Sequence, residues 1–166
     1  VREGMPVQIA VIGPGDCSSE EAEAAETVGA LIALNHEIVC CGGLGGVMEA
    51  ACRGAKEEGG MTVGILPDTG DGNGFLDVII RTGLGHARNV VLVQSADAVI
   101  AVGGAYGTLS EIAIALKTGI PVFGWKTHDV DGVFRCATPE EAVVMAVRAA
   151  RLFRGSRTRQ GPAAPG

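Results

Sequence analysis

The sequence predicts a Rossmann-like α/β fold, a doubly wound parallel sheet with helices on both faces. Short apolar runs alternate with longer segments of helical spacing along most of the chain. These runs are continuously apolar, which is typical of parallel strands buried on both faces. Glycines follow several of the runs directly, at the strand ends where such sheets bind ligands.

The first half of the chain contains three predicted strands and two predicted helices. We expect strands at 7–13, 36–43 and 61–67, and helices at 18–34 and 46–60. Ser18 and Glu21 have the spacing of a capping box, in which each side chain bonds the other residue's backbone amide. The first helix therefore begins at this pair.

The second half continues the alternation. We expect strands at 77–83, 97–104 and 120–125, and helices at 86–96, 106–119 and 138–153. Thr138 is the expected N-cap of the last helix, and Pro139 its first residue. The glycine-rich segment 68–74 is predicted as a loop, open to a role as a mobile flap over a ligand. The domain is expected to span 1–153, and the Pro/Gly-rich tail 154–166 to be disordered.

Composition excludes several classes of function. The net charge is −6 and the basic residues are scattered outside the tail, which argues against a nucleic-acid surface. No apolar run reaches the roughly 18 residues that a membrane span requires. The 5 cysteines lack a metal or disulfide spacing, so free thiols are expected. A cytoplasmic location follows as an expectation, with no signal-peptide layout against it.

Two common nucleotide-binding motifs fit poorly. The P-loop pattern GxxxxGK[ST] does not occur, which excludes a P-loop NTPase. The segment GPGDCS at 13–18 partly matches a dinucleotide fingerprint, but Pro14 removes one amide from the loop. The second strand also lacks a terminal acid for a ribose hydroxyl. The pattern therefore disfavours NAD.

Two other glycine-rich segments fit a phosphate site better. GGLGGVM at 42–48 and GGAYGTLSE at 103–111 each lead into a predicted helix at the same edge of the sheet. Helix amino termini attract anions, and glycine lets the backbone approach a ligand closely. Thr108 adds a hydroxyl donor. A small phosphorylated ligand is the expected partner.

The extended segments GGLGGVMEAACRGA at 42–55 and GGAYGTLSEIAIALKTGIPV at 103–122 resemble the paired motifs of the lonely-guy (LOG)/lysine-decarboxylase-like superfamily. They are most similar to the branch that contains the molybdenum cofactor carrier protein. The resemblance covers nearly the whole chain except the tail. It implies a Rossmann-like fold, a homodimer or larger homo-oligomer, and a phosphorylated small-molecule ligand. It does not imply a pyridoxal-phosphate-dependent lysine decarboxylase.

The resemblance also implies the site residues. Arg88 and Glu111 correspond to the catalytic residues of the superfamily's phosphoribohydrolases. The ligand-binding residues that it implies are Gly42, Gly43, Gly46, Met48, Gly104, Gly107 and Thr108. The glycine-rich strand ends add Gly13, Gly15 and Ala105 as expected phosphate- and ligand-binding residues.

This chain departs from the hydrolase pattern at three places. Gly103-Gly104-Ala105 replaces Pro-Gly-Gly, Glu49 replaces a glycine, and Asn89 replaces the usual lysine. These departures favour the carrier-like branch.

The chemistry expected of the pair is cleavage of an N-glycosidic bond. Glu111, assigned to the first helical turn where the dipole favours its ionised form, would stabilise an oxocarbenium-like ribosyl group. Arg88 would clamp the phosphate or assist the departing base. Asp16 and Asp77 are candidates for a second acid.

Structural alternatives for these residues remain open. Thr108 and Glu111 have capping-box spacing, Arg88 could pair with a surface acid, and Met48 is more typical of a core. His86 could line the pocket or be an ordinary helix residue. The segments 71–74 and 128–131 lack full metal-ligand spacing, so no metal site is expected.

Three functions remain open. The leading one is a nucleoside 5′-monophosphate phosphoribohydrolase that releases free base and ribose 5-phosphate without a cofactor. The alternative is a non-catalytic carrier of a phosphorylated pterin, with molybdenum cofactor as the bound ligand. The third is a nucleotide sensor without turnover.

Overall fold

The computed structural model describes residues 4–159, which form a parallel seven-stranded sheet in the order β4-β3-β2-β1-β5-β6-β7. The strands are β1 (Gln8–Ile12), β2 (Ile38–Cys41), β3 (Thr62–Leu66), β4 (Val78–Arg81), β5 (Ala98–Val102), β6 (Val122–Trp125) and β7 (Val133–Arg135). The helices are α1 (Ser19–Leu34), α2 (Val47–Glu57), α3 (Arg88–Ser95), α4 (Tyr106–Lys117) and α5 (Pro139–Arg159), with a short 3₁₀ helix η1 (Gly85–Ala87) before α3. The predicted fold class is confirmed.

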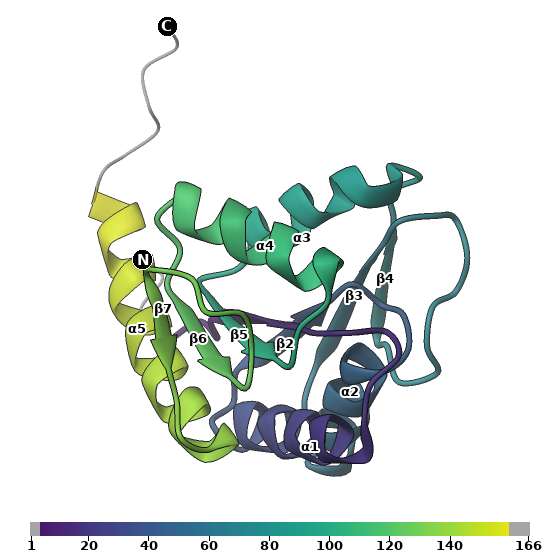
Figure 1. The fold of residues 1–166 in the computed structure, drawn as a ribbon, viewed down its shortest axis with the longest axis horizontal. Helices are drawn as coiled ribbons and strands as arrows, with labels where there is room; N and C mark the ends of the chain where they lie inside the picture. The colour runs from purple at the N-terminus through teal and green to yellow at the C-terminus, as the bar shows by residue number, and fades with distance from the viewer. Residues whose placement is uncertain (1–3, 160–166) are drawn as a thin grey trace, which may run out of the picture.

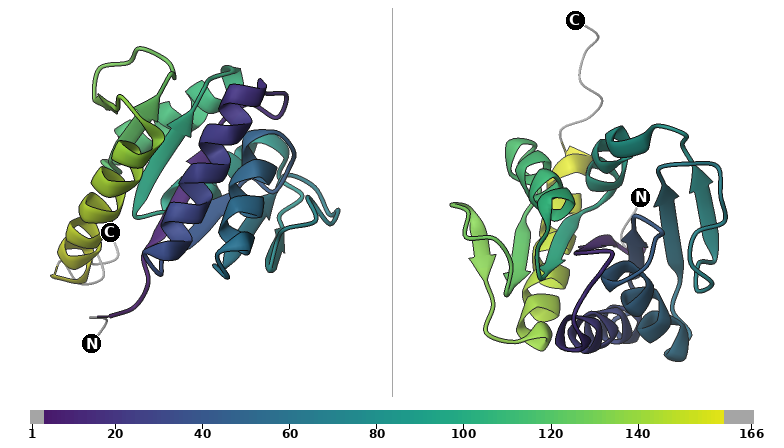
Figure 2. Two further views of the ribbon diagram at one scale, coloured as in Figure 1. Left: turned by 90° about the horizontal axis from the view of Figure 1, so that it is seen from below. Right: turned by 45° about the vertical axis from the view of Figure 1, so that its right-hand side comes forward.

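The helices form two layers, one on each face of the sheet. Helices α1, α2 and α5 lie side by side on one face, and α3 and α4 cover the other (Figures 1 and 2). Strand β1 pairs with β2 on one side and with β5 on the other, so the strand order reverses beside β1. Ligands of doubly wound folds bind beyond the carboxyl ends of the strands at such a reversal.

The two central strands explain the unbroken apolar runs of the sequence. Every residue of β5 is buried, and only Gln8 at the start of β1 is partly exposed. Both faces of these strands pack against helices, so neither face selects polar residues.

Helices α1 and α2 approach so closely that two glycines are required between them. A Cβ on Gly29 would lie 1.8 Å from the backbone oxygen of Ala51, and one on Gly54 would lie 2.0 Å from that of Glu26. Arg53 pairs with Glu26 at 2.9 Å beside this contact. This packing fixes the start of α2, which carries one of the glycine-rich loops.

Strand β7 and the end of α5 differ most from the sequence prediction. Strand β7 was not predicted, because its three residues, one half-buried and two exposed, leave no apolar pattern. Helix α5 runs to Arg159, so the prediction of a disordered tail is wrong for 154–159, and residues 160–166 lie outside the described part. Arg151 and Arg154 hold the end of α5, each 2.6 Å from Glu37 and Asp97 respectively. No helix within residues 4–159 is long and apolar enough to cross a membrane.

Candidate ligand-binding site

Three glycine-containing loops meet beyond the carboxyl ends of β1, β2 and β5. The β1–α1 loop contacts the β2–α2 loop, where the Val47 amide donates to the Pro14 oxygen at 3.1 Å. A Cβ on Gly46 would lie 2.3 Å from the same oxygen, and Gly46 has φ +63°. A Cβ on Gly13 would lie 2.4 Å from the backbone oxygen of Val102 at the end of β5. Close approach of backbones therefore requires glycine at both positions.

Arg88 and Glu111 lie together at this edge. Arg88 begins α3 and Glu111 lies on α4, and these helices cover the same face of the sheet (Figure 1). The Arg88 Nη1 atom lies 3.8 Å from Glu111 Oε1, with Arg88 7% and Glu111 6% exposed. A Cβ on Gly42 would lie 2.1 Å from Arg88 Nη1, so Gly42 leaves the space that the guanidinium occupies.

The capping-box alternative for Glu111 is wrong. Helix α4 begins at Tyr106 with Ala105 as its N-cap, and no side chain caps it. Thr108 is thus inside the helix rather than before it, and Glu111 belongs to the second turn. The pattern Thr-x-x-Glu caps only when the threonine precedes the helix, as Ser18 does in α1. The first turn of α4 contains no acidic residue and no side chain caps it, which suits an external anion at this helix end.

Burial controls the ionisation of the pair. It raises the pKa of Glu111 from 4.5 to about 7, and the nearby Arg88 opposes this rise. Burial also lowers the pKa of Arg88, an effect that Glu111, Cys41 and Asp68 oppose. The expectation that the dipole keeps Glu111 ionised relied on a first-turn position, which Glu111 does not occupy. Burial instead moves the pKa of its carboxyl group toward neutral pH.

This shift predicts a pH-dependent stability. Between pH 4.5 and 7 the folded protein holds a proton on Glu111 that the unfolded chain has released. The free energy of unfolding therefore falls as pH rises through this window, by at most about 3 kcal/mol. A Glu111→Gln variant lacks the titrating group and should not show this part of the decrease. Urea unfolding of both proteins at about pH 5 and pH 8 measures the difference, and parallel pH profiles would contradict the shift.

Two buried donors beside the pair have no protein partner. Within residues 4–159, Arg88 Nε and Thr108 Oγ1 are buried without a hydrogen bond. A buried polar group left unpaired costs roughly 1–3 kcal/mol. Thr108 lies in the first turn of α4, whose dipole favours negative charge, and the Arg88 side chain reaches Glu111 one turn further along the same helix. The arrangement is chemically suited to an anion that accepts hydrogen bonds from these groups.

The remaining predicted ligand-binding residues line or support the same edge. Gly43 has φ +78°, and its amide donates to Cys41 Sγ at 3.3 Å. Met48 is 8% exposed and belongs to the core, with its methyl group 3.9 Å from a Cβ built on Gly15. Gly104 and Ala105 contact His128, whereas a Cβ on Gly107 would meet nothing within 4 Å.

The two candidates for a second acid differ in position. Asp77 lies away from the site, where it pairs with Lys56 at 2.8 Å and accepts from the Thr62 amide at the start of β3. Asp16 is exposed in the β1–α1 loop. Of these two candidates, Asp16 is the one that lies at the carboxyl edge of the sheet.

Two asparagines brace the site: Asn89, which the sequence marked only as a departure from the hydrolase pattern, and Asn73, which sequence reasoning missed. Asn89 Nδ2 donates to Ser110 Oγ at 3.0 Å and links α3 to α4. The backbone N–H of Asn73 donates to the Gly43 oxygen at 2.8 Å, and its side-chain Nδ2 donates to the Leu44 oxygen at 3.0 Å. These bonds anchor the 68–74 loop to the β2–α2 loop. An asparagine in a loop gives no pattern from which such a contact could be predicted.

His86, the other pocket candidate, is exposed on η1.

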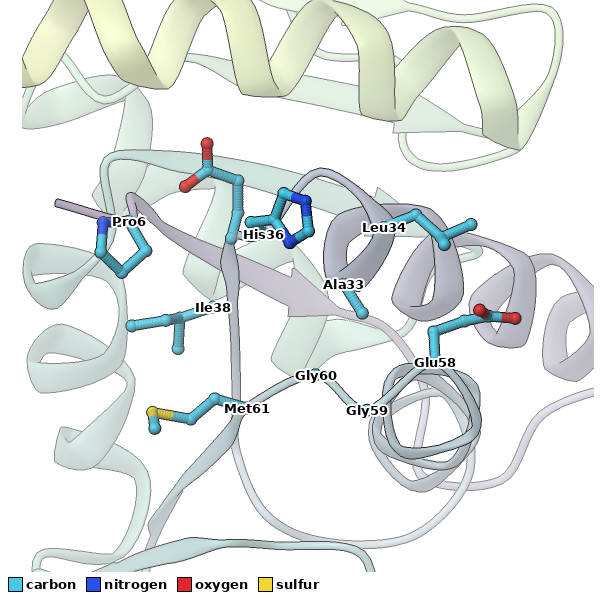
Figure 3. A pocket seen from close by; sticks show the side chains of 10 residues that line it. Pro6, Ala33, Leu34, His36, Ile38, Glu58, Gly59, Gly60 and Met61 are labelled. Atoms are coloured by element: carbon cyan, nitrogen blue, oxygen red, sulfur yellow. The ribbon is translucent and has the colours of Figure 1, made fainter. Parts of the chain in front are cut away.

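A separate cavity of about 310 Å³ lies at the opposite edge of the sheet, near the start of β2 and β3 (Figure 3). Its lining consists of Pro6, Ala33, Leu34, His36, Glu37, Ile38, Glu58, Gly59, Gly60 and Met61. Because all strands are parallel, this edge holds their amino ends. The cavity is therefore remote from the glycine loops and contains none of the predicted site residues.

Known proteins resemble this chain over most of its length. The SLOG cluster4 family matches residues 6–152. An uncharacterized protein of Archaeoglobus fulgidus is 53% identical over 139 residues, which cover 82% of this chain and 92% of that protein.

Solved structures of similar proteins cover the same region. The molybdenum cofactor binding protein of Rippkaea orientalis is 36% identical with a TM-score of 0.81, covering 86% of this chain and 96% of that chain. The molybdenum cofactor carrier protein of Chlamydomonas reinhardtii is 35% identical with a TM-score of 0.81, covering 88% and 99% respectively. These likenesses support the resemblance to the carrier branch that the paired motifs predict. With the family match extending from β1 into α5, the chain belongs to the SLOG cluster4 family.

Proposed function

We propose that this protein binds a small phosphorylated ligand, with the phosphate at the amino terminus of α4. The observation that carries the proposal is two buried donors without a protein partner: Thr108 Oγ1 in the uncapped first turn of α4, and Arg88 Nε on the side chain that reaches Glu111 of the same helix. A phosphate oxygen accepts hydrogen bonds from both donors and from the first-turn amides. The charge of Arg88 offsets that of the phosphate.

The ligand class that we favour is a phosphorylated pterin of the molybdenum cofactor type, bound as cargo without chemical change. Two similar solved structures support this class, one of a molybdenum cofactor binding protein and one of a molybdenum cofactor carrier protein. The departures from the hydrolase motifs at Glu49 and at Gly103-Gly104-Ala105 point the same way. Calorimetric titration with molybdopterin and with its dephosphorylated form tests the class. Equal affinity for the two forms would contradict a phosphate anchor.

Gly107 provides a test of where the phosphate lies. A Cβ at this position meets nothing within 4 Å, so alanine fits the protein itself and raises helix propensity. If the phosphate lies against the first turn of α4, the methyl group intrudes on it. We expect Gly107→Ala to weaken molybdopterin binding about tenfold without loss of stability, because a close backbone approach is blocked.

The matched control for this variant is Gly155→Ala. Gly155 also lies in a helix with nothing within 4 Å of a Cβ, on α5 and away from the glycine loops. Its affinity should stay within twofold of the wild type. Unchanged affinity in Gly107→Ala would place the phosphate elsewhere.

A second candidate function is hydrolysis of nucleoside 5′-monophosphates, and the titration of Glu111 near neutral pH favours it. A carboxyl group that exchanges its proton near pH 7 suits acid–base chemistry on a departing base. As the carboxylate, it also stabilises positive charge on a ribosyl group. A buried carboxylate beside an anion site weakens anion binding, so its presence needs a reason that binding alone does not supply.

Incubation with a panel of nucleoside 5′-monophosphates separates the two functions. Free base and ribose 5-phosphate released by the wild type, with a loss of about a hundredfold in Glu111→Gln, would establish the hydrolase. Release by neither protein, together with tight molybdopterin binding, would leave the carrier. Equal release by both proteins would remove Glu111 from the mechanism.

A further inference from the structure

His128 connects the segment after β6 to the loop that starts α4. Its Nε2 atom lies 3.0 Å from the backbone oxygen of Ala105. Because a carbonyl oxygen only accepts hydrogen bonds, Nε2 carries the proton and donates. Ala105 is the N-cap of α4, so this bond holds the residue from which the helix begins.

Gly104 leaves the space that the His128 ring occupies. A Cβ on Gly104 would lie 2.8 Å from both Cδ2 and Nε2 of His128. Gly104 does not adopt a positive φ, so space rather than backbone conformation accounts for glycine here. The ring therefore packs directly on the β5–α4 loop.

Two backbone bonds also hold this loop: the Gly103 amide donates to the Trp125 oxygen at 3.1 Å, and the Leu109 amide donates to the Ala105 oxygen at 3.0 Å. Helix α4 lacks a side-chain cap of its own, so His128 supplies the side-chain bond at its N-cap. On either side of His128, Lys126 pairs with Glu20 at 2.5 Å and Asp129 pairs with Arg135. These pairs hold the ends of the segment, and His128 bridges from between them to Ala105.

We propose that His128 is a positioning residue, which sets the direction of the first amides of α4 toward the phosphate of the ligand. This inference rests on the proposed phosphate site. His128 acts through Ala105: the imidazole fixes the N-cap, and the N-cap fixes where the amides of the first turn point. A helix amino terminus binds an anion through those amides, so a looser N-cap weakens binding.

The test compares His128→Ala with His128→Gln. Both lack the imidazole, but the glutamine amide can donate to the Ala105 oxygen as Nε2 does. Inorganic phosphate is titrated into ¹⁵N-labelled protein, and the amide signals of residues 103–108 report binding. We expect His128→Ala to weaken phosphate binding about fivefold, the effect of one hydrogen bond, and His128→Gln to restore most of it.

Gly104→Ala supplies a second, independent variant. Its Cβ displaces the imidazole, so it should weaken phosphate binding as much as His128→Ala does. In the double variant the ring is absent and the new methyl group has space, so no further loss is expected. Such non-additivity is the signature of two residues that act through one contact. Thermal unfolding of each variant shows whether weaker phosphate binding comes with a loss of stability. A positioning effect changes the phosphate affinity without a matching loss of stability.

The outcomes separate the inference from the site. A phosphate affinity of His128→Ala equal to that of the wild type, or additive losses of affinity in the double variant, would overturn the positioning role. Either result would leave the phosphate site intact. A wild type whose 103–108 signals do not respond to phosphate would overturn the site, and the positioning role with it.

Discussion

Replacing Arg88 by methionine is expected to weaken the binding of molybdopterin about a hundredfold. The guanidinium is buried, lies against Gly42 and 3.8 Å from Glu111 of α4, and its Nε atom has no hydrogen-bond partner among the described residues. A hydrogen bond to a charged group contributes about 1.5–3 kcal/mol, and a hundredfold loss corresponds to about 2.8 kcal/mol. Methionine keeps an apolar stem along the same path but supplies neither charge nor donors.

The fold should survive this change because Glu111 can become neutral. Burial already raises its pKa to about 7, and Arg88 is the neighbour that holds it down. Without Arg88 the carboxyl group stays protonated at neutral pH, so no unpaired buried charge remains. Calorimetric titration together with urea unfolding checks both statements.

Arg53→Met is the matched control. Arg53 pairs with Glu26 beside the α1–α2 contact, and its side chain is 37% exposed. Exposed pairs of this kind contribute little, so affinity for molybdopterin should change by less than about twofold. An Arg88→Met protein with wild-type affinity, or with an equal loss for the dephosphorylated pterin, would contradict the role of Arg88 in holding the phosphate.

Replacing Gly29 by alanine is expected to lower the free energy of unfolding by about 3 kcal/mol. The added Cβ would lie 1.8 Å from the backbone oxygen of Ala51. A backbone atom cannot rotate away as a side chain can, so α1 and α2 must separate. That movement shifts the start of α2 and the loop that contains Gly42 and Gly46.

Urea denaturation measures this loss, with Gly155→Ala as the control. Both glycines lie inside helices, but a Cβ on Gly155 meets nothing within 4 Å. The control should gain about 0.5–1 kcal/mol, since alanine loses less backbone entropy on folding. If Gly29→Ala were as stable as this control, the α1–α2 contact would be looser than the structure shows.

Three copies of one local pattern show how far the sequence can be read. Ser18-x-x-Glu21 caps α1 with both bonds of a capping box. At the start of α5, the Glu141 amide donates to Thr138 Oγ1 at 3.1 Å. Thr108-x-x-Glu111 has the same spacing, yet Thr108 lies inside α4 and Glu111 faces Arg88. The residue at which a helix begins depends on how the preceding loop packs, and that packing involves residues distant in sequence.

The fold class and most elements followed from the sequence alone, because they depend on local patterns. Continuous apolar runs indicated buried parallel strands, helical spacing indicated the covering layers, and glycines marked the edge where the loops meet. Strand β7 and the end of α5 did not follow, because a short exposed strand has no apolar period and α5 is held by ion pairs with Glu37 and Asp97.

The electrostatics and the supporting contacts of the site were decided only by the tertiary structure. The pKa of Glu111 follows from burial, and the need for glycine at 42 and 104 follows from the side chains of Arg88 and His128. Each of these depends on atoms brought together from separate elements. A sequence determines which groups are available, whereas the distances that set their desolvation and hydrogen bonding exist only after the sheet and its two helical layers have packed.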